Sequence, residues 1–218
     1  MSITNQQMTR PHTKARLYVD THFKDGNVIE LPSDQTHYLL NVLRLSVGSS
    51  IAVFNGVDGE YLVEITNVVK KCCSISIKMR LRPQIYCRDL WLLFAPVKKA
   101  RLDFIAQKAS ELGVSLIWPI KTDFCQVSRV NDDRLLANAI EAAEQTERYD
   151  IAEIRSFSSL SKVLQNCENE RLLIWCDEAS AGYPALNITT ALATAPPHEK
   201  AAVLIGPEGG FSETERTH

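Results

Sequence analysis

The stretch Ala201-Ala-Val-Leu-Ile-Gly-Pro-Glu-Gly-Gly-Phe-Ser-Glu-Thr-Glu215 decides the fold of the C-terminal part of this chain. Its apolar residues 203–205 predict a buried strand, which breaks at the glycine-rich residues 206–210. Ser212 and Glu215 then form the pattern of a capping box, which predicts the start of a helix. This order is typical of a ligand-holding loop, because glycines let backbone N–H groups approach a ligand. An ordinary tight turn is the alternative, since glycine and proline are common in turns.

The glycine spacing argues against two common nucleotide sites. It does not match Gly-x-Gly-x-x-Gly, and it lacks the Lys-Ser/Thr pair of a phosphate-binding loop. A dinucleotide site or a nucleoside triphosphate site is therefore poorly supported.

Upstream of this stretch, short apolar runs alternate with helical patterns. Runs at 90–95, 116–120 and 172–176 predict buried strands, and the spacing of apolar residues predicts helices over 102–112, 135–143 and 158–167. Strands that alternate with helices predict a parallel sheet with right-handed crossovers. Ligands of such sheets bind beyond the carboxyl ends of the strands, which is where residues 177–178 and 206–210 fall.

In the N-terminal part, the apolar residues repeat with a different period. Apolar and polar residues alternate over 61–66 and 73–79, which predicts a half-buried antiparallel sheet with Cys72 and Cys73 on opposite faces. One helix interrupts the strands, and we expect Asp34 to cap it and Arg44 to lie near its end. A small β-barrel is the economical architecture. The predicted organisation is a barrel over 1–82, a linker over 83–89 and an α/β domain over 90–218.

Composition narrows the class of protein. The 218 residues contain no apolar run near the ~20 that a membrane helix needs, and residues 1–13 lack the apolar core of a signal peptide. The six cysteines have no metal-ligand spacing, so we predict free thiols, no metal and a cytoplasmic protein. Residues 1–83 hold 10 Lys and Arg against 7 Asp and Glu, whereas the remainder is acidic. A basic part beside an acidic one is compatible with a nucleic-acid-docking module joined to a catalytic module.

Three groups of residues are candidates for chemistry besides the glycine loop. Lys98, Lys99 and Arg101 follow the first buried strand and could contact nucleic-acid backbone, or simply be a solvated helix start. Glu144 and Arg148 are four residues apart and could pair along a helix, or Gln145 and Arg148 could face a substrate. The third group is a set of polar and basic residues in the N-terminal part, and the alternative is that they simply form the surface of the barrel: Arg10, Lys14, Arg16, His37, Arg44 and Asn55. No Ser/His/Asp or Cys/His arrangement emerges, and we interpret His37 as structural.

The stretch Ile205-Gly-Pro-Glu-Gly-Gly-Phe-Ser212 resembles the SPOUT-class methyltransferases that methylate N3 of a uridine in small-subunit (16S) ribosomal RNA. Further matches occur in the family's order: Arg16-Leu-Tyr-Val19, His37-Tyr-Leu-Leu-Asn-Val-Leu-Arg44, Phe54-Asn-Gly56 with Gly59-Glu-Tyr61, Gln107-Lys-Ala-Ser-Glu-Leu-Gly113, and Glu141-Ala-Ala-Glu-Gln-Thr-Glu-Arg148. The likeness extends from about Arg10 to the last residue.

The resemblance implies a PUA-like RNA-binding β-barrel followed by an α/β domain with a deep trefoil knot. It implies S-adenosylmethionine as methyl donor, the 16S ribosomal RNA or small subunit as partner, and a homodimer with active sites near the subunit interface. The cofactor pocket would be lined by Leu204, Ile205, Gly206, Pro207, Glu208, Gly209 and Gly210, with Glu178 in a second wall. The candidate RNA contacts become Arg10, Arg16, Arg44, Asn55, Lys98 and Lys99.

Methylation of a uridine N3 needs alignment with the methyl donor and loss of the imide proton. A positive charge near O2 or O4 would stabilise the uridine anion, and our hypothesis for that charge is Arg148, from its place in the matching helix. No residue suggests itself as the general base.

Two departures from the family stand out. Thr122-Asp-Phe-Cys-Gln-Val127 replaces a short Arg-Ser turn, which leaves any substrate contact there open. The chain ends at His218, one turn into the helix begun at Ser212, whereas the family continues with a helix, a strand and a final helix that complete the knot. We therefore expect an incomplete knot and weak binding of S-adenosylmethionine, from truncation or a missing tail.

Two other functions are weighed against this one. A non-catalytic RNA-binding protein would keep the basic N-terminal part and a degenerate α/β domain. A small-molecule enzyme would use the Gly-Pro-Glu-Gly-Gly turn for an unrelated nucleotide. Methyl transfer to ribosomal RNA would exclude the first, and a panel of cofactors in a thermal-shift assay would separate the second.

Overall fold

A computed structural model describes residues 13–70, 72–97, 99–180, 183, 187–195 and 197–217, with the side chains of 99, 100 and 180 left out. The chain divides into two compact units, Met1–Ile85 and Tyr86–His218. The boundary falls within the predicted linker, although strand β6 already begins at Asp89. No helix in the described part of the chain is long and apolar enough to cross a membrane.

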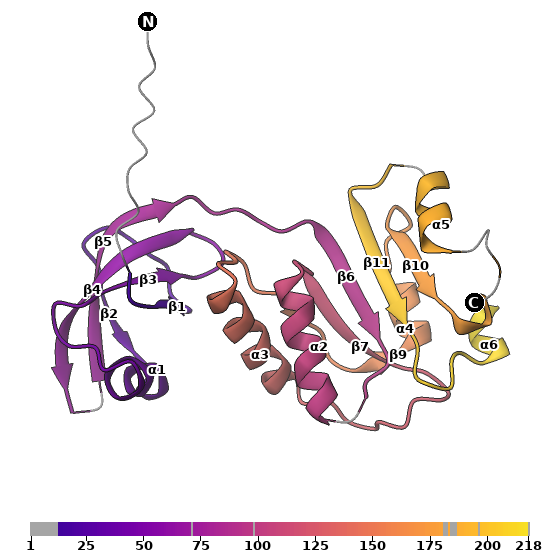
Figure 1. Ribbon diagram of the computed structural model, residues 1–218, viewed down its shortest axis with the longest axis horizontal. Helices are drawn as coiled ribbons and strands as arrows, with labels where there is room; N and C mark the ends of the chain where they lie inside the picture. Colours follow the sequence, from indigo (N-terminus) through magenta and orange to yellow (C-terminus); the bar gives the residue numbers. More distant parts are fainter. Residues whose placement is uncertain are drawn as a thin grey trace, which may run out of the picture. The chain divides into compact units, whose positions relative to one another are not determined.

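The first unit is built on a five-stranded sheet with the strand order β1-β3-β4-β5-β2 (Figure 1). The strands are β1 (Arg16–Tyr18), β2 (Val28–Leu31), β3 (Ser50–Phe54), β4 (Glu60–Val69) and β5 (Cys72–Arg82). All neighbouring pairs are antiparallel except β1 and β3, which are parallel. The antiparallel sheet predicted from the period of two is thus confirmed.

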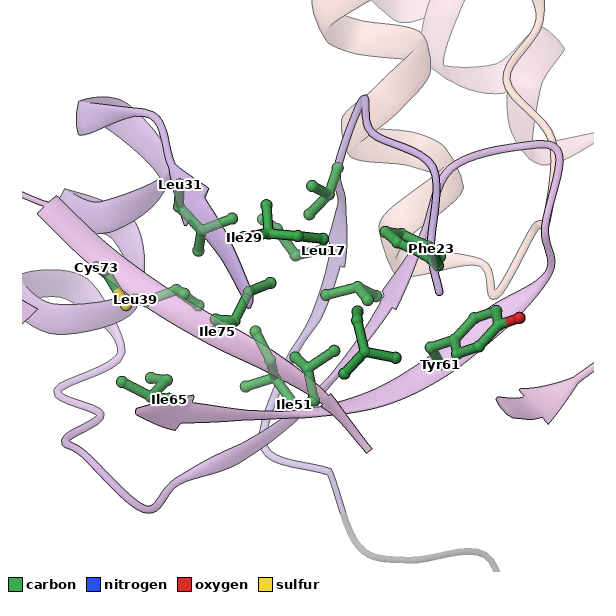
Figure 2. Close-up of a cluster of buried hydrophobic side chains, with 14 of the residues drawn as sticks. Leu17, Phe23, Ile29, Leu31, Leu39, Ile51, Tyr61, Ile65, Cys73 and Ile75 are labelled. Carbon is green, nitrogen blue, oxygen red and sulfur yellow. The ribbon is translucent and has the colours of Figure 1, made fainter. Parts of the chain in front are cut away.

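Alternate residues of these strands form one hydrophobic core. Val63 lies opposite Ile77, and Ile65 lies opposite Ile75, so their side chains share a face. Figure 2 shows Ile51, Ile65 and Ile75 directed into the same cluster. Cys73 is buried on this face and Cys72 is exposed, as the alternation predicts. Each fully buried aliphatic side chain here contributes roughly 1.5–3 kcal/mol to stability.

The helix of this unit differs in detail from its prediction. It consists of α1 (Ser33–His37), which continues directly into a π-helical segment, η1 (Tyr38–Val42). The N-cap is Pro32 without a side-chain cap, so the prediction that Asp34 caps the helix is wrong. Asp34 lies instead in the first turn, where a negative charge interacts favourably with the helix dipole. Arg44 follows the helix with a φ of 54°, and its side chain is exposed.

The second unit contains a parallel sheet with the strand order β10-β11-β6-β7-β8, and β9 also pairs with β7. Its strands are β6 (Asp89–Phe94), β7 (Leu116–Lys121), β8 (Glu153–Ile154), β9 (Ser158–Ser159), β10 (Leu172–Cys176) and β11 (Lys200–Ile205). Every pairing is parallel, which confirms the α/β prediction. The helical segments are α2 (Lys99–Glu111), α3 (Asp132–Gln145), α4 (Leu160–Gln165), η2 (Glu178–Ser180), α5 (Ile188–Thr194) and α6 (Glu213–Arg216). The sequence did not predict α5.

Both faces of the central strands β6 and β7 are covered, which explains why these strands are continuous apolar runs. At the edge of the sheet, β10 has only partly buried and exposed residues, so the prediction that residues 172–176 form a buried strand is wrong in its burial. Phe94 and Ile117 pack on one face with Ala109 of α2 and Ala139 of α3. The cluster on the other face contains Leu93, Trp118, Leu204, Phe211 and the α4 residues Leu160 and Val163. Helices α2 and α3 lie next to each other, and the strand arrows of β6 and β11 point toward the same edge (Figure 1). The segments after β6, β7, β10 and β11 therefore meet at this carboxyl edge.

Candidate functional site

The glycine-rich residues after β11 form a tight turn. The Gly210 backbone N–H donates to the Pro207 carbonyl at 2.9 Å, and Gly210 has a φ of 69°, in the left-handed region that favours glycine. At position 206 a glycine is required because a side chain would clash with a neighbour. A Cβ at position 206 would lie 2.7 Å from the ring of Phe211, so the space of the missing side chain is filled from within the protein. The turn is held by packing, and the ligand-approach argument does not apply to Gly206.

The predicted capping box is present and connects the turn to the neighbouring strand β7. The Glu215 carboxylate accepts from the Ser212 backbone N–H and, through its other oxygen, from the Asp123 backbone N–H, both at 2.9 Å. The Ser212 hydroxyl donates to the Asp123 carboxylate at 2.6 Å. Because Asp123 follows β7, these bonds fix the segments after β11 and β7 relative to each other.

An ion pair connects the same helix to the end of β10. Arg216 Nε donates to Asp177 Oδ2 at 2.6 Å, and Arg216 Nη2 donates to Oδ1 at 3.1 Å. The hydrogen bonds from Arg216 lower the pKa of the Asp177 carboxyl. Glu178 begins the short helix η2 and is exposed beside this pair.

A cavity of about 740 Å³ opens at the carboxyl ends of β6, β7 and β11. It is lined by Pro96, Val97, Arg101, Phe124, Gln126, Val127, Pro207, Glu208 and Gly209. Arg101 Nη1 lies 3.8 Å from Glu208 Oε1, and the two side chains are 77% and 80% exposed. An ion pair this exposed contributes little to stability, so both charges remain available to a ligand.

This arrangement fits S-adenosylmethionine as a cofactor. Small-molecule sites have volumes of roughly 300–1,000 Å³, apolar walls and a few polar groups, and the cavity has all three. Pro207, Glu208 and Gly209 supply main-chain atoms in a turn that is closed by a hydrogen bond, and the Glu208 carboxylate is available to a positively charged ligand.

Only some of the predicted cofactor residues line the cavity. Pro207, Glu208 and Gly209 line the cavity. Ile205, which precedes the turn in sequence, is partly exposed. Leu204 is fully buried in the core, so only its backbone could contact a ligand. Glu178 is not one of the described residues that line the cavity, and it lies after the strand on the other side of β11. Gly210 is buried, and Gly206 is covered by Phe211.

Within one chain, Arg148 lies at the edge of the sheet opposite to this cavity. It follows α3, at the edge where the strands begin, and its side chain is buried. Its Nε donates to the Asp150 carboxylate at 2.8 Å, and its Nη1 donates to the Ser110 carbonyl at 2.9 Å. Helices that follow parallel strands return to the opposite edge of the sheet, which is why sequence adjacency to a matching motif did not place Arg148 near the glycine turn. Its role toward a uridine stays a prediction.

The predicted RNA contacts are also separated by the structure. Arg44 is exposed and free of a structural role in the described contacts of its unit. Arg16 instead pairs with the buried Glu60 at 2.8 Å and stacks on Phe54. The Asn55 side-chain amide donates to the Asp58 carboxylate in its own loop and to the carbonyl of Thr21 in a separate segment. These two side chains have structural partners that compete with RNA. Arg10, Lys98 and the Lys99 side chain lie outside the described residues.

Sequence reasoning missed most of the cavity wall. Phe124, Gln126 and Val127 were considered only as a departure from a family pattern, and Pro96 and Val97 were not considered. The available signal was their position after β6 and β7, because segments after parallel strands meet at one edge.

The described residues contain no group of three or more His, Cys, Asp and Glu side chains that could hold a metal ion. All six cysteines are free. Burial raises the pKa of the Cys73, Cys87, Cys167 and Cys176 thiols, so these four stay protonated near neutral pH and are poor nucleophiles.

Comparison with known proteins agrees with this geometry. A family model described as an RNA methyltransferase domain matches residues 86–218, and one described as an RNA methyltransferase PUA domain matches residues 31–78. The ribosomal RNA small subunit methyltransferase E of Rickettsia conorii is 32% identical over 202 residues, which cover 92% of this chain and 80% of the relative.

Solved structures show the same fold. A methyltransferase of Legionella pneumophila, solved in complex with bound S-adenosylmethionine, is 29% identical with a TM-score of 0.79 over 94% of this chain and 84% of that chain. The ribosomal RNA small subunit methyltransferase E of Neisseria gonorrhoeae, also bound to S-adenosylmethionine, superimposes with a TM-score of 0.80 at 24% identity over 94% of this chain and 84% of that chain. The predicted fold class, a PUA-like unit followed by a SPOUT-type α/β unit, is confirmed. The chain belongs to the RNA methyltransferase family, together with the ribosomal RNA small subunit methyltransferases E.

Proposed function

We propose that this protein methylates N3 of a uridine in the 16S ribosomal RNA of the small subunit, with S-adenosylmethionine as the methyl donor. The observation that carries the proposal is the cavity at the carboxyl ends of β6, β7 and β11, with the hydrogen-bonded glycine turn in its wall. The relatives named ribosomal RNA small subunit methyltransferase E support the RNA substrate, and the neighbours solved with S-adenosylmethionine support the donor.

When bound, the cofactor supplies a methyl group already activated on a sulfonium. The work left to this chain is to align the uridine with that methyl group, to exclude water and to favour loss of the N3 proton. The main chain of Pro207, Glu208 and Gly209 would hold the cofactor, whose methyl group would pass to N3 as the uridine gives up its N3 proton. The turn from Gly206 to Gly210, held by Phe211 and the capping box, provides a fixed wall for this alignment.

The roles of individual residues belong to the same proposal. The backbone of residues 204–210 would contact the donor, with Glu178 in a wall on the β10 side. Residues 1–82 would bind RNA, with Arg44 as the best placed of the described candidates. Two chains would form a homodimer, and Arg148 could meet a uridine only if the second chain brought the substrate to it. The protein would act in the cytoplasm, on the ribosomal RNA itself.

Methyl transfer from radiolabelled S-adenosylmethionine to unmethylated small subunits tests the proposal. We compare Gly210→Ala with Gly48→Ala, because both glycines have positive φ and only Gly210 belongs to the turn. Both variants place an alanine in the left-handed region, which costs roughly 1–2 kcal/mol. We expect Gly210→Ala alone to weaken cofactor binding in calorimetry and to slow transfer. Absence of transfer by the wild-type protein, with intact RNA binding, would support a non-catalytic RNA-binding protein instead.

A further inference from the structure

Phe124 occupies an unusual place for a large aromatic residue. It follows β7, the residue is 49% exposed, and it is part of the wall of the 740 Å³ cavity. A single exposed hydrophobic residue is common and carries no functional meaning by itself. The position of Phe124 in a cavity wall, directly against the glycine turn, is what distinguishes it from the other exposed hydrophobic residues of this unit.

The backbone that carries the Phe124 side chain is held in place by its neighbours. Its backbone lies inside a turn closed by the Cys125 N–H, which donates to the Thr122 carbonyl at 3.1 Å. The preceding residue, Asp123, is held by Ser212 and Glu215. On the other side, the Phe124 Cβ lies 3.3 Å from the position that a Cβ would take at Gly209. A backbone that is held in this way reduces the conformational entropy that is lost when a flat ligand stacks on the ring.

The groups around the ring match a pyrimidine base attached to a phosphate backbone. Arg101 provides a positive charge in a weak, exposed pair, which a phosphate or a base anion could replace. Gln126 provides an amide, which can donate to a base carbonyl. Single-stranded RNA is generally recognised by bases that are splayed out and stacked on aromatic side chains.

The topology assigns this flank of the turn to the acceptor base. The turn follows β11, which lies between β10 on one side and β6 and β7 on the other. In the proposed function the donor contacts the turn and the β10 side, where Glu178 lies. The two reactants then share the cavity: the donor takes the side formed by Pro207, Glu208 and Gly209 and extends toward β10, and the β7 side, where Phe124 lies, is left for the uridine.

We propose that Phe124 positions the target uridine by stacking on its base, and that Arg101 supplies positive charge to that base and its phosphate. This inference rests on the proposed methyl transfer. Stacking orients the plane of the base, which sets the direction in which N3 points, and the positive charge favours the deprotonated imide. Phe124 is thus a positioning residue, and its effect is expected on the RNA and not on the cofactor.

Steady-state kinetics of the 218-residue protein on unmethylated small subunits test this assignment. We compare Phe124→Ala and Phe124→Trp, and take Phe104→Ala as the matched control, since Phe104 is 60% exposed on α2 and does not line the cavity. Loss of one stacked base is expected to lower kcat/KM for RNA by about 5- to 150-fold in Phe124→Ala. Phe124→Trp, which retains a stacking face, should stay within about threefold of wild type, and so should Phe104→Ala.

Three outcomes would overturn the assignment. The first is unchanged kcat/KM in Phe124→Ala. The second is an equal loss in Phe104→Ala, which would make the effect independent of the cavity. The third is weaker binding of S-adenosylmethionine by Phe124→Ala in calorimetry, which would place the cofactor, and not the base, on the ring.

A binding measurement separates this inference from the proposed function. In Phe124→Trp the new indole reports stacking as fluorescence quenching, measured as the difference from wild type to remove the signal of the three native tryptophans. A ten-nucleotide oligouridine should quench this signal, and the same backbone without bases should not. Quenching without any methyl transfer by the wild-type protein would remove the proposed function and keep a base site. Methyl transfer without quenching would support the proposed function and remove the base site on residue 124.

Discussion

The two edges of the parallel sheet use charged residues in opposite ways. At the amino edge, Arg171 is buried, donates to both oxygens of Asp89 at 2.8 Å and to the Ala201 carbonyl, and stacks on Trp91. At the carboxyl edge, Arg101 and Glu208 form only a long pair exposed to water. A buried arginine that is bonded to a carboxylate and to main-chain carbonyls holds strands together, whereas an exposed arginine beside a cavity can exchange its partner for a ligand. The amino edge is thus built for stability, and the carboxyl edge leaves charges for binding.

The largest loss of unfolding free energy is expected for a substitution at the amino edge. Arg171→Ala removes the contacts that join the starts of β10, β11 and β6, and leaves the Asp89 carboxylate without its guanidinium. Breaking a buried ion pair by removal of one partner costs about 3–5 kcal/mol, and we expect the lower half of this range because Asp89 is partly exposed. Urea unfolding measures the loss. The exposed Arg134→Ala serves as the control, and an equal loss there would contradict the comparison.

Arg148→Ala tests whether this residue serves stability or catalysis. The loss of its bonds to Asp150 and Ser110 should cost about 3 kcal/mol of unfolding free energy. If Arg148 is structural, the fraction that remains folded will transfer methyl groups with the wild-type kcat. A fall of tenfold or more in kcat under fully folded conditions would restore the hypothesis that Arg148 stabilises a uridine anion.

Acid should destabilise the amino edge in a defined pH range. Burial alone would raise the pKa of the Asp150 carboxyl, but the hydrogen bonds from Arg148 and from the Cys87 backbone N–H outweigh it and lower the pKa. A carboxyl with a lowered pKa in the folded state contributes stability above its unfolded pKa of about 3.9, and this contribution is lost as the pH falls through the folded value. Asp150→Asn should therefore be less stable at pH 7 and show a shallower decline of stability below about pH 4 than wild type. Parallel curves of unfolding free energy against pH would contradict this.

The smallest effect on stability is expected at the carboxyl edge. Arg101→Gln removes one member of a long, exposed pair, so the unfolding free energy should change by less than about 0.5 kcal/mol. The same variant should lower methyl transfer to RNA, and Arg101→Lys, which keeps the charge, should restore part of it. A stability loss as large as that of Arg171→Ala would show that the two edges do not differ in the way described.

Local patterns predicted the elements well. The alternation from Tyr61 to Ile65 led to the correct buried face, and the Ser212–Glu215 capping box led to the correct helix start. Both signals depend on residues a few positions apart, whose relation is the same in any fold. The prediction for Asp34 was wrong because the choice of N-cap depends on where the chain enters the helix, which the tertiary structure sets at Pro32.

The candidate site was predicted only in part. The glycine turn and its place after a parallel strand were foreseen, because the break from an apolar run to Gly206-Pro-Glu-Gly-Gly210 is local. The partners of that turn were not foreseen. Phe124 is more than 80 positions from Gly209 in sequence, and it reaches the turn only because β7 lies two strands from β11 in the sheet.

The sequence by itself determined the two kinds of sheet, the glycine turn and the resemblance to RNA methyltransferases, since each depends on short-range periodicity or on a contiguous motif. Only the tertiary structure decided which charged residues are available to a ligand. Arg16, Arg148 and Arg171 are buried in ion pairs and Arg101 is exposed beside a cavity, although all four are arginines in unremarkable local sequence. The physical reason is that burial and pairing depend on which strand ends meet at an edge, and strand order is a property of the whole fold.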